Sequence, residues 1–205
     1  YAIKAQTIFD CDRLLENHAV IIQDQIILQV MPGQEVPPTL EMQDIGEGIL
    51  APGFIDIQVN GGGGVMLNNA PTRESVDIIT TSHRSTGTTS MMPTLISDSR
   101  ANQQAAIDAV REARASGNAG VLGIHIEGPF FDLEKRGTHK ASMIRLPQAE
   151  DIDCLSSLGD LKVIVTLAPE HAQPGQIRQL AEAGVHVCAG HTNATYAQIK
   201  NAVAE

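Results

Sequence analysis

Two segments of the sequence place a side chain that can bind a metal ion at the end of a short apolar run. Glu127 ends the run that begins at Gly123, and His191 closely follows the run that begins at Val185. Each run is typical of a buried parallel strand, and the catalytic groups of parallel barrels lie at the C-terminal ends of the strands. A carboxylate and an imidazole at that rim indicate a site for Zn²⁺ or a related ion. The third protein ligand that such a site takes is not obvious among these residues.

Structural roles are the alternative for the residues of these two segments. A glutamate can also cap a helix or pair with a basic residue, although the Gly-Pro pair after Glu127 ends the strand and keeps the carboxylate at the rim. A lone histidine at a strand end, such as His191, can be structural too. His125 lies two residues before Glu127 and therefore faces the same side of the strand. We expect it to be a hydrogen-bonded core histidine, at the rim or behind the ligands.

Gln58 and Asn60 share a face at the end of the first predicted barrel strand. A binuclear hydrolase would have two histidines at these positions. Amides are weak ligands for transition metals, so we expect no second ion here, and hydrogen bonding to loop backbone is the alternative role. The glycines at 61–64 are followed by neither a phosphate-loop lysine nor an immediate helix, which predicts a flexible rim loop.

A long polar loop follows Glu127 and contains Lys135, Arg136, Thr138 and His139. It lies on the same predicted rim, where loops carry substrate contacts. His139 is therefore a candidate for substrate binding, and a solvated loop histidine is the alternative. Glu170, at the end of another strand, is predicted to be a structural cap.

The elements that must position these residues fall into two parts. Residues 1–50 contain short β-branched runs and a predicted hairpin, typical of a small β-domain. Residues 51–205 alternate strands with amphipathic helices, which favours parallel βα units. The predicted strands are 54–59, 88–95, 121–127, 161–167 and 185–189, and the predicted helices are 73–85, 99–116, 148–158, 174–183 and 196–204. Five such strands form either part of an eight-stranded (β/α)₈ TIM-type barrel or a complete doubly wound sheet.

Composition narrows the possible partners. The chain has 14 Lys and Arg against 24 Asp and Glu, a net charge of −10, and no basic cluster, so we expect neither a nucleic-acid nor a membrane partner. No apolar run approaches the ~20 residues of a membrane span. Three widely spaced cysteines suit a reducing compartment. We therefore expect a cytoplasmic protein.

Six motifs, in order along the chain, resemble those of the N-acetylglucosamine-6-phosphate deacetylase family of the amidohydrolase superfamily. They are Pro52-Gly53-Phe54-Ile55-Asp56 with Gln58-x-Asn60-Gly61, Met92-Pro93-Thr94-Leu95, His125-x-Glu127-Gly128-Pro129, Lys135-x-Gly137-Thr138-His139, Thr166-Leu167-Ala168-Pro169-Glu170 and Gly190-His191-Thr192-Asn193-Ala194-Thr195. The resemblance covers essentially all 205 residues. It implies an α/β fold: a distorted (β/α)₈ barrel, of which about five βα units lie in 51–205, beside a small N-terminal β-sandwich to which residues 1–50 contribute.

The resemblance also implies roles for individual residues. Glu127 and His191 would bind one divalent ion, Zn or Fe, while Thr138 and His139 would contact the amino sugar. The family replaces the usual His-x-His with residues such as Gln58 and Asn60, which implies a single metal. The implied reaction is deacetylation of N-acetylglucosamine 6-phosphate to glucosamine 6-phosphate and acetate, in amino-sugar catabolism, by a cytoplasmic homodimer.

The remaining functional residues of the family have no counterpart in this sequence. A further ligand histidine, the general-base aspartate and the phosphate-binding residues are expected beyond Glu205, so no catalytic residue is assigned in this chain. We expect the N-terminal half of the enzyme, inactive by itself. Alternatives are an N-acetylgalactosamine-6-phosphate deacetylase, another amidohydrolase acting on a cyclic amide or an aminopurine, and a truncated chain that only folds or associates.

Overall fold

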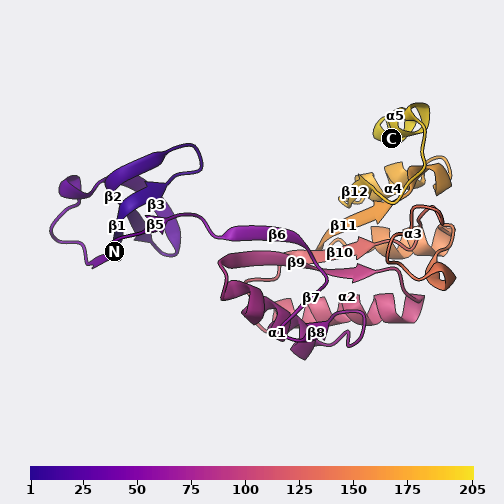
Figure 1. Ribbon diagram of the computed structural model, residues 1–205, viewed down its shortest axis with the longest axis horizontal. Coiled ribbons are helices and arrows are strands. Elements are labelled where there is room, and N and C mark those ends of the chain that lie inside the picture. The colour runs from indigo at the N-terminus through magenta and orange to yellow at the C-terminus, as the bar shows by residue number, and fades with distance from the viewer. The chain divides into compact units, whose positions relative to one another are not determined.

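The computed structural model describes residues 1–205, which divide into two compact units, Tyr1–Gly53 and Phe54–Glu205 (Figure 1). The boundary predicted after residue 50 lies close to this division. Each unit has its own buried apolar residues. None of the helices is long and apolar enough to cross a membrane.

The first unit is one mixed five-stranded sheet. Its strands are β1 (Ala2–Phe9), β2 (Leu14–Gln23), β3 (Ile26–Pro32), β4 (Met42–Asp44) and β5 (Ile49–Leu50). β1, β2 and β3 pair antiparallel in the order β3-β2-β1, and β4 and β5 both pair parallel with β1. The predicted hairpin is present: Asp24 and Gln25 connect β2 to β3 with positive φ angles of 49° and 67°, as a tight two-residue turn requires.

The second unit contains a sheet of five parallel strands in chain order. These are β6 (Phe54–Val59), β9 (Thr88–Ile96), β10 (Gly123–Glu127), β11 (Lys162–Leu167) and β12 (His186–Ala189), side by side in Figure 1. A doubly wound sheet reverses its strand order at a switch point, and this sheet does not. Parallel strands in uninterrupted chain order are the topology of a (β/α)₈ barrel. The unit is therefore a five-stranded part of such a barrel.

Five α-helices accompany these strands, close to where the sequence predicts them. They are α1 (Arg73–Arg84), α2 (Arg100–Ala115), α3 (Ala149–Ser156), α4 (Gln176–Glu182) and α5 (Tyr196–Val203). The side chains of Thr72, Ser99 and Thr195 accept backbone N–H bonds at the starts of α1, α2 and α5, which satisfies donors that the helix itself leaves free. The apolar stripe of α2 is fully buried and joins the core formed by the strands.

The glycine-rich segment after β6 is a short hairpin, where the sequence predicted a loop without paired strands. β7 (Gly61–Gly62) pairs antiparallel with β8 (Val65–Met66), and Gly63 and Gly64 turn between them with φ angles of 60° and 85°. A Cβ atom at Gly61 would collide with the carbonyl oxygen of Val65, so a side chain is excluded there. His83 Nε2 lies 2.9 Å from the Gly61 carbonyl oxygen and ties the hairpin to α1.

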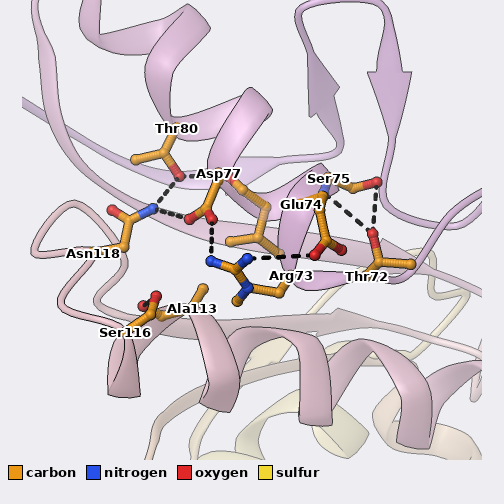
Figure 2. A network of polar contacts seen from close by, with 10 residues as sticks. Thr72, Arg73, Glu74, Ser75, Asp77, Thr80, Ala113, Ser116 and Asn118 are labelled. Carbon is orange, nitrogen blue, oxygen red and sulfur yellow. Dashed lines mark hydrogen bonds and ion pairs between the residues drawn. The ribbon is translucent and has the colours of Figure 1, made fainter.

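A polar network joins α1 to the loop that precedes β10 (Figure 2). Arg73 Nη1 donates to Asp77 at 3.2 Å, and Asn118 Nδ2 donates to Asp77 at 2.8 Å and to Thr80 Oγ1 at 3.3 Å. Asn118 precedes β10, so the network lies at the opposite end of that strand from Glu127. The residues of this network bond to one another, and they link α1 to the loop before β10 at a distance from the candidate site.

Candidate metal centre

Glu127 and His191 meet at the C-terminal end of the parallel sheet. Glu127 is the last residue of β10, and His191 follows β12 after Gly190. The Nε2 atom of His191 lies 3.2 Å from Oε1 of Glu127. Glu127 is buried, with 7% of its surface exposed, and His191 is partly buried. The two strand ends thus deliver a carboxylate and an imidazole to one point, in the pattern typical of a barrel active site.

The hydrogen bonds of His191 leave the lone pair of Nε2 facing this carboxylate. Its Nδ1 lies 2.9 Å from the carbonyl oxygen of Lys135, and because a carbonyl can only accept, Nδ1 carries the proton. Two acceptors, Nε2 and the carboxylate oxygen, then face each other across 3.2 Å. That arrangement is repulsive unless a cation lies between them or a proton is added. A backbone carbonyl on one ring nitrogen is also the usual partner of a metal-binding histidine, so the donor set fits a Zn²⁺-type ion.

His139 lies beside Glu127 and His191, and its ring nitrogens have the opposite roles to those of His191. The backbone N–H of Ser97 donates to Nδ1 of His139 at 3.2 Å, and Oγ of Ser97 lies 2.8 Å from the same atom. Nδ1 is therefore an acceptor, and Nε2 carries the proton. That Nε2 lies 3.8 Å from Glu127 Oε1, and one ligand atom from each of Glu127, His139 and His191 falls within 4.8 Å of the others. His139 presents a donor to the site.

Phe131 supports both histidine rings. It stacks on His191 with ring centroids 4.3 Å apart and an interplanar angle of 30°, and it meets His139 edge-on at 4.8 Å and 86°. Both Phe131 and His139 are almost completely buried, so the alternative of a solvated loop histidine does not describe His139. The aromatic contact fixes the planes of the two rings and keeps water from one side of them.

Glu127 is held in its ionised form by its surroundings. Its pKa is lowered to about 2, chiefly by the His139 imidazole, whose Nε2 lies 3.8 Å from Oε1; burial opposes this effect. Glu127 is therefore ionised throughout the physiological range. An ionised, buried carboxylate that faces a free imidazole lone pair is a favourable cation site.

His125 uses both ring nitrogens within the fold. Nδ1 donates to the carbonyl oxygen of Ile57 at 3.0 Å, and Nε2 lies 2.8 Å from Oγ1 of Thr166, whose hydroxyl can donate to it. Burial lowers the pKa of His125, although the Ile57 carbonyl opposes that shift. The ring thereby connects β10 to β6 and β11, and no nitrogen is left for an ion.

The other predicted site residues lie on neighbouring loops and strand ends. Gln58 is exposed near the end of β6, and Thr138 is exposed beside His139. Asn60 follows β6, and its Nδ2 atom is buried without a hydrogen-bond partner. A buried donor of this kind needs an acceptor from water or a ligand. None of the three forms a hydrogen bond with Glu127 or His191, and their roles stay predictions.

Comparison with known proteins identifies the family. A model described as the NagA composite domain matches residues 1–49, and the model of the amidohydrolase family matches residues 49–205. This chain belongs to the amidohydrolase family.

Several deacetylases resemble this amidohydrolase chain. It is 40% identical over 185 residues to N-acetylgalactosamine-6-phosphate deacetylase from Shewanella sp. (strain ANA-3). That alignment covers 88% of this chain and 46% of the Shewanella protein. It is 35% identical over 202 residues to N-acetylglucosamine-6-phosphate deacetylase from Haemophilus influenzae, covering 98% and 53%. The chain thus spans about half the length of the curated relatives it matches.

Solved structures share the fold. The crystal structure of N-acetylglucosamine-6-phosphate deacetylase from Pasteurella multocida superposes with a TM-score of 0.93 at 32% identity, over 100% of this chain and 54% of that one. A variant of N-acetyl-D-glucosamine-6-phosphate deacetylase from Mycobacterium smegmatis, in complex with N-acetyl-D-glucosamine-6-phosphate, gives 0.85 at 28% identity, over 99% and 52%. The partial amidohydrolase barrel predicted from the sequence is confirmed.

Two residues of this amidohydrolase site are missing from the sequence prediction. Ser97 directly follows β9, so its place at a strand end was the available signal. Phe131 lies two residues beyond Pro129, inside a segment that the sequence presents as a polar loop. Ser97 contacts His139, and Phe131 contacts both His139 and His191, so both act on the site through the histidines.

Proposed function

We propose that this chain forms part of a metal-dependent amidohydrolase that converts N-acetylglucosamine 6-phosphate to glucosamine 6-phosphate and acetate, in amino-sugar catabolism. The observation that carries the proposal is the Nε2 lone pair of His191 facing the ionised carboxylate of Glu127 beside the Nε2–H donor of His139. Amidohydrolases are typically metal-dependent, and relatives of this chain are named as deacetylases of hexosamine 6-phosphates. A structural relative has also been crystallised with N-acetyl-D-glucosamine-6-phosphate.

The residues of the site divide the chemistry between them. A divalent cation held by Glu127 and His191 would supply the Lewis acidity that polarises an acetyl carbonyl and activates water. His139 points its Nε2–H into the same space, where it can donate to a substrate oxygen and orient the amide. Phe131 fixes the planes of both rings, which limits the reorganisation needed during the reaction. From the family resemblance we expect the general base to be an aspartate outside residues 1–205.

A second candidate substrate is N-acetylgalactosamine 6-phosphate. The observation that favours it is the 40% identity to the Shewanella N-acetylgalactosamine-6-phosphate deacetylase, against 35% for the Haemophilus influenzae protein. The two sugars are epimers that differ in the orientation of one hydroxyl group, so an enzyme can distinguish them by its contact with that hydroxyl. Such a contact can discriminate strongly when a buried polar group would otherwise be left unpaired.

The test is acetate release by the intact protein from both sugar phosphates, with added Zn²⁺ or Fe²⁺. We expect turnover of N-acetylglucosamine 6-phosphate with the higher kcat/KM, and loss of that turnover in Glu127→Gln. A higher kcat/KM for the galactosamine epimer would establish the second candidate instead. Acetate release from neither sugar phosphate by metal-loaded protein would refute the proposal.

The identity of the ion, the assembly and the location belong to the same proposal. A carboxylate with an imidazole suits Zn²⁺ and Fe²⁺ alike, and their relative affinities overlap. We propose one such ion per chain, a homodimer, and a cytoplasmic location. Elemental analysis of protein purified without added metal, and light scattering of the same sample, measure the first two.

A further inference from the structure

His191 has an unusual backbone conformation for its residue type. Its φ angle is +51°, in the left-handed region that favours glycine, and the residue before it is Gly190. A non-glycine residue there carries a conformational cost of about 1 kcal/mol or more, which the surrounding contacts must offset. The segment 191–194 is therefore held in place by its neighbours, and those neighbours decide where the His191 ring points.

One neighbour is Glu170, in the 3₁₀ turn Pro169–His171 that follows β11. Its Oε2 accepts a short hydrogen bond from the hydroxyl of Thr192, and its Oε1 accepts the backbone N–H of Asn193 at 2.7 Å. Thr192 Oγ1 also accepts the N–H of Ala194 at 2.8 Å. A single carboxylate thus fixes the two residues directly after His191.

The other neighbour is the loop after β10. The backbone N–H of Asp132 donates to the carbonyl oxygen of His191 at 3.0 Å, and the side-chain amide of Asn193 donates to the carboxylate of Asp132 at 3.0 Å. Ligand atoms of Asp132, Glu170 and His171 lie within 4.8 Å of one another. Both oxygens of Glu170 are nevertheless engaged by the 192–193 segment, so its role is to hold that segment.

We propose that Glu170 is a positioning residue of the metal centre, which keeps His191 in its left-handed conformation with Nε2 directed at Glu127. The inference rests on the proposed function, in which Glu127 and His191 bind the ion. Glu170 itself touches neither the ion nor the substrate. Residues that orient metal ligands in this way typically change metal affinity by ten- to a hundredfold when they are replaced.

The experiment compares the Zn²⁺ affinity of intact protein variants by competition with a chromophoric chelator. We expect Glu170→Ala to weaken binding about tenfold or more, and Thr192→Val, which removes only the hydroxyl, to weaken it in the same direction. Glu170→Gln keeps one acceptor for the Asn193 N–H and is expected to lose less. The visible spectrum of the Co²⁺-substituted protein should change in Glu170→Ala, because the His191 nitrogen is displaced.

The charge-matched control is Glu150→Ala. Glu150 lies in the first turn of α3 with 85% of its side chain exposed. Its replacement should leave the Zn²⁺ affinity within about twofold of the wild-type value. Far-UV circular dichroism of the metal-free proteins checks folding; if Glu170→Ala does not fold, Thr192→Val and Glu170→Gln decide. Wild-type affinity and Co²⁺ spectrum in the folded variants would overturn the inference. If His191→Ala also keeps wild-type affinity, the proposed metal centre fails instead.

Discussion

An imidazole has two nitrogens, and the partner of one determines what the other can do. In His191 the Nδ1–H donates to a backbone carbonyl, and Nε2 is left as an acceptor that faces a carboxylate. In His139 a backbone N–H occupies Nδ1, and Nε2 is left as a donor. In His125 both nitrogens are used within the fold. The three histidines therefore offer the site different groups: His191 offers a free acceptor, His139 offers a donor, and His125 offers neither.

Ser97→Ala tests the role of His139 at the residue scale. The variant removes the hydroxyl beside Nδ1 and leaves the backbone N–H, so the ring loses part of the support for its tautomer. We expect kcat/KM of the intact enzyme to fall by up to about tenfold, the value of one hydrogen bond, with metal content unchanged. Ser116→Ala is the matched control, because its hydroxyl bonds Ala113 at the end of α2. Loss of metal in Ser97→Ala, or an unchanged kcat/KM, would contradict this role.

The site could be predicted from sequence only in part, for a physical reason. Glu127 and His191 each follow an apolar run that is local in sequence, and parallel strands bring their ends to one edge. The contact between Ser97 and His139 spans 42 positions and depends on how the loop after β10 folds back. No local pattern encodes that path. The packing of Phe131 against two histidines is likewise a property of the folded loop.

At the scale of elements, sequence periodicity located every long helix and strand. Alternating apolar strands and amphipathic helices carry strong local signals, so α1, α2 and β9 to β12 lie close to the predicted ranges. The hairpin β7–β8 was missed because strands of two residues have no periodicity. It depends instead on glycines in positive-φ conformations and on the contact from His83. The order of the strands in the sheet could not be predicted from the sequence either. The structure supplied it, and this order distinguishes a partial barrel from a doubly wound sheet.

The buried carboxylate of Asp151 links the start of α3 to the start of α2 through an ion pair with Arg100. It lies in the first turn of α3, is 2% exposed, and accepts two hydrogen bonds from Arg100 at 2.7 and 2.9 Å and one from Arg145 at 2.8 Å. Burial raises the pKa of Asp151, but the bonds from Arg100 and from the Gln148 backbone, with the charge of Arg145, outweigh it and lower the pKa overall. The carboxylate therefore stabilises the fold in its ionised form.

We expect Asp151→Asn to lower the free energy of unfolding by about 3 kcal/mol near neutral pH, the lower end for a broken buried pair, because Arg100 can rehydrate. A carboxylate whose pKa is lower in the folded protein than in the unfolded chain stabilises the fold at pH values above its ordinary pKa of ~3.9. That stabilisation is lost as the pH falls through the lower pKa of the folded protein. The difference between wild type and variant should therefore shrink in acid. Urea titrations of both proteins across this range measure it. An equal difference at all pH values would contradict the ionic role of Asp151.

At the scale of the whole molecule, the candidate metal centre lies within one of two compact units. Glu127 and His191, the proposed ligands, both lie in Phe54–Glu205, at the end of β10 and just after β12. An ion that binds only the folded state adds stability by mass action, about 2.7 kcal/mol at a hundred times its dissociation constant. That stabilisation should act on the unit that contains the ligands.

Removal of metal from the intact protein should therefore lower its thermal unfolding temperature and reduce amide hydrogen-exchange protection mainly within residues 54–205. Peptides from residues 1–53 should exchange at the same rate with and without chelator, which makes them an internal control. Restoring Zn²⁺ should reverse the change. Equal loss of protection in both units, or none in β10 and β12, would show that the ion is held elsewhere.

The central claim is that Glu127 and His191 hold the ion while His139 acts on the substrate. Metal content per chain, measured by elemental analysis on the intact protein and three variants, tests it most directly. We predict about one ion in the wild type, severe loss in Glu127→Ala and His191→Ala, and retention in His139→Gln, whose kcat/KM alone should fall. Full metal content in Glu127→Ala or His191→Ala, or loss of metal in His139→Gln, would contradict the account.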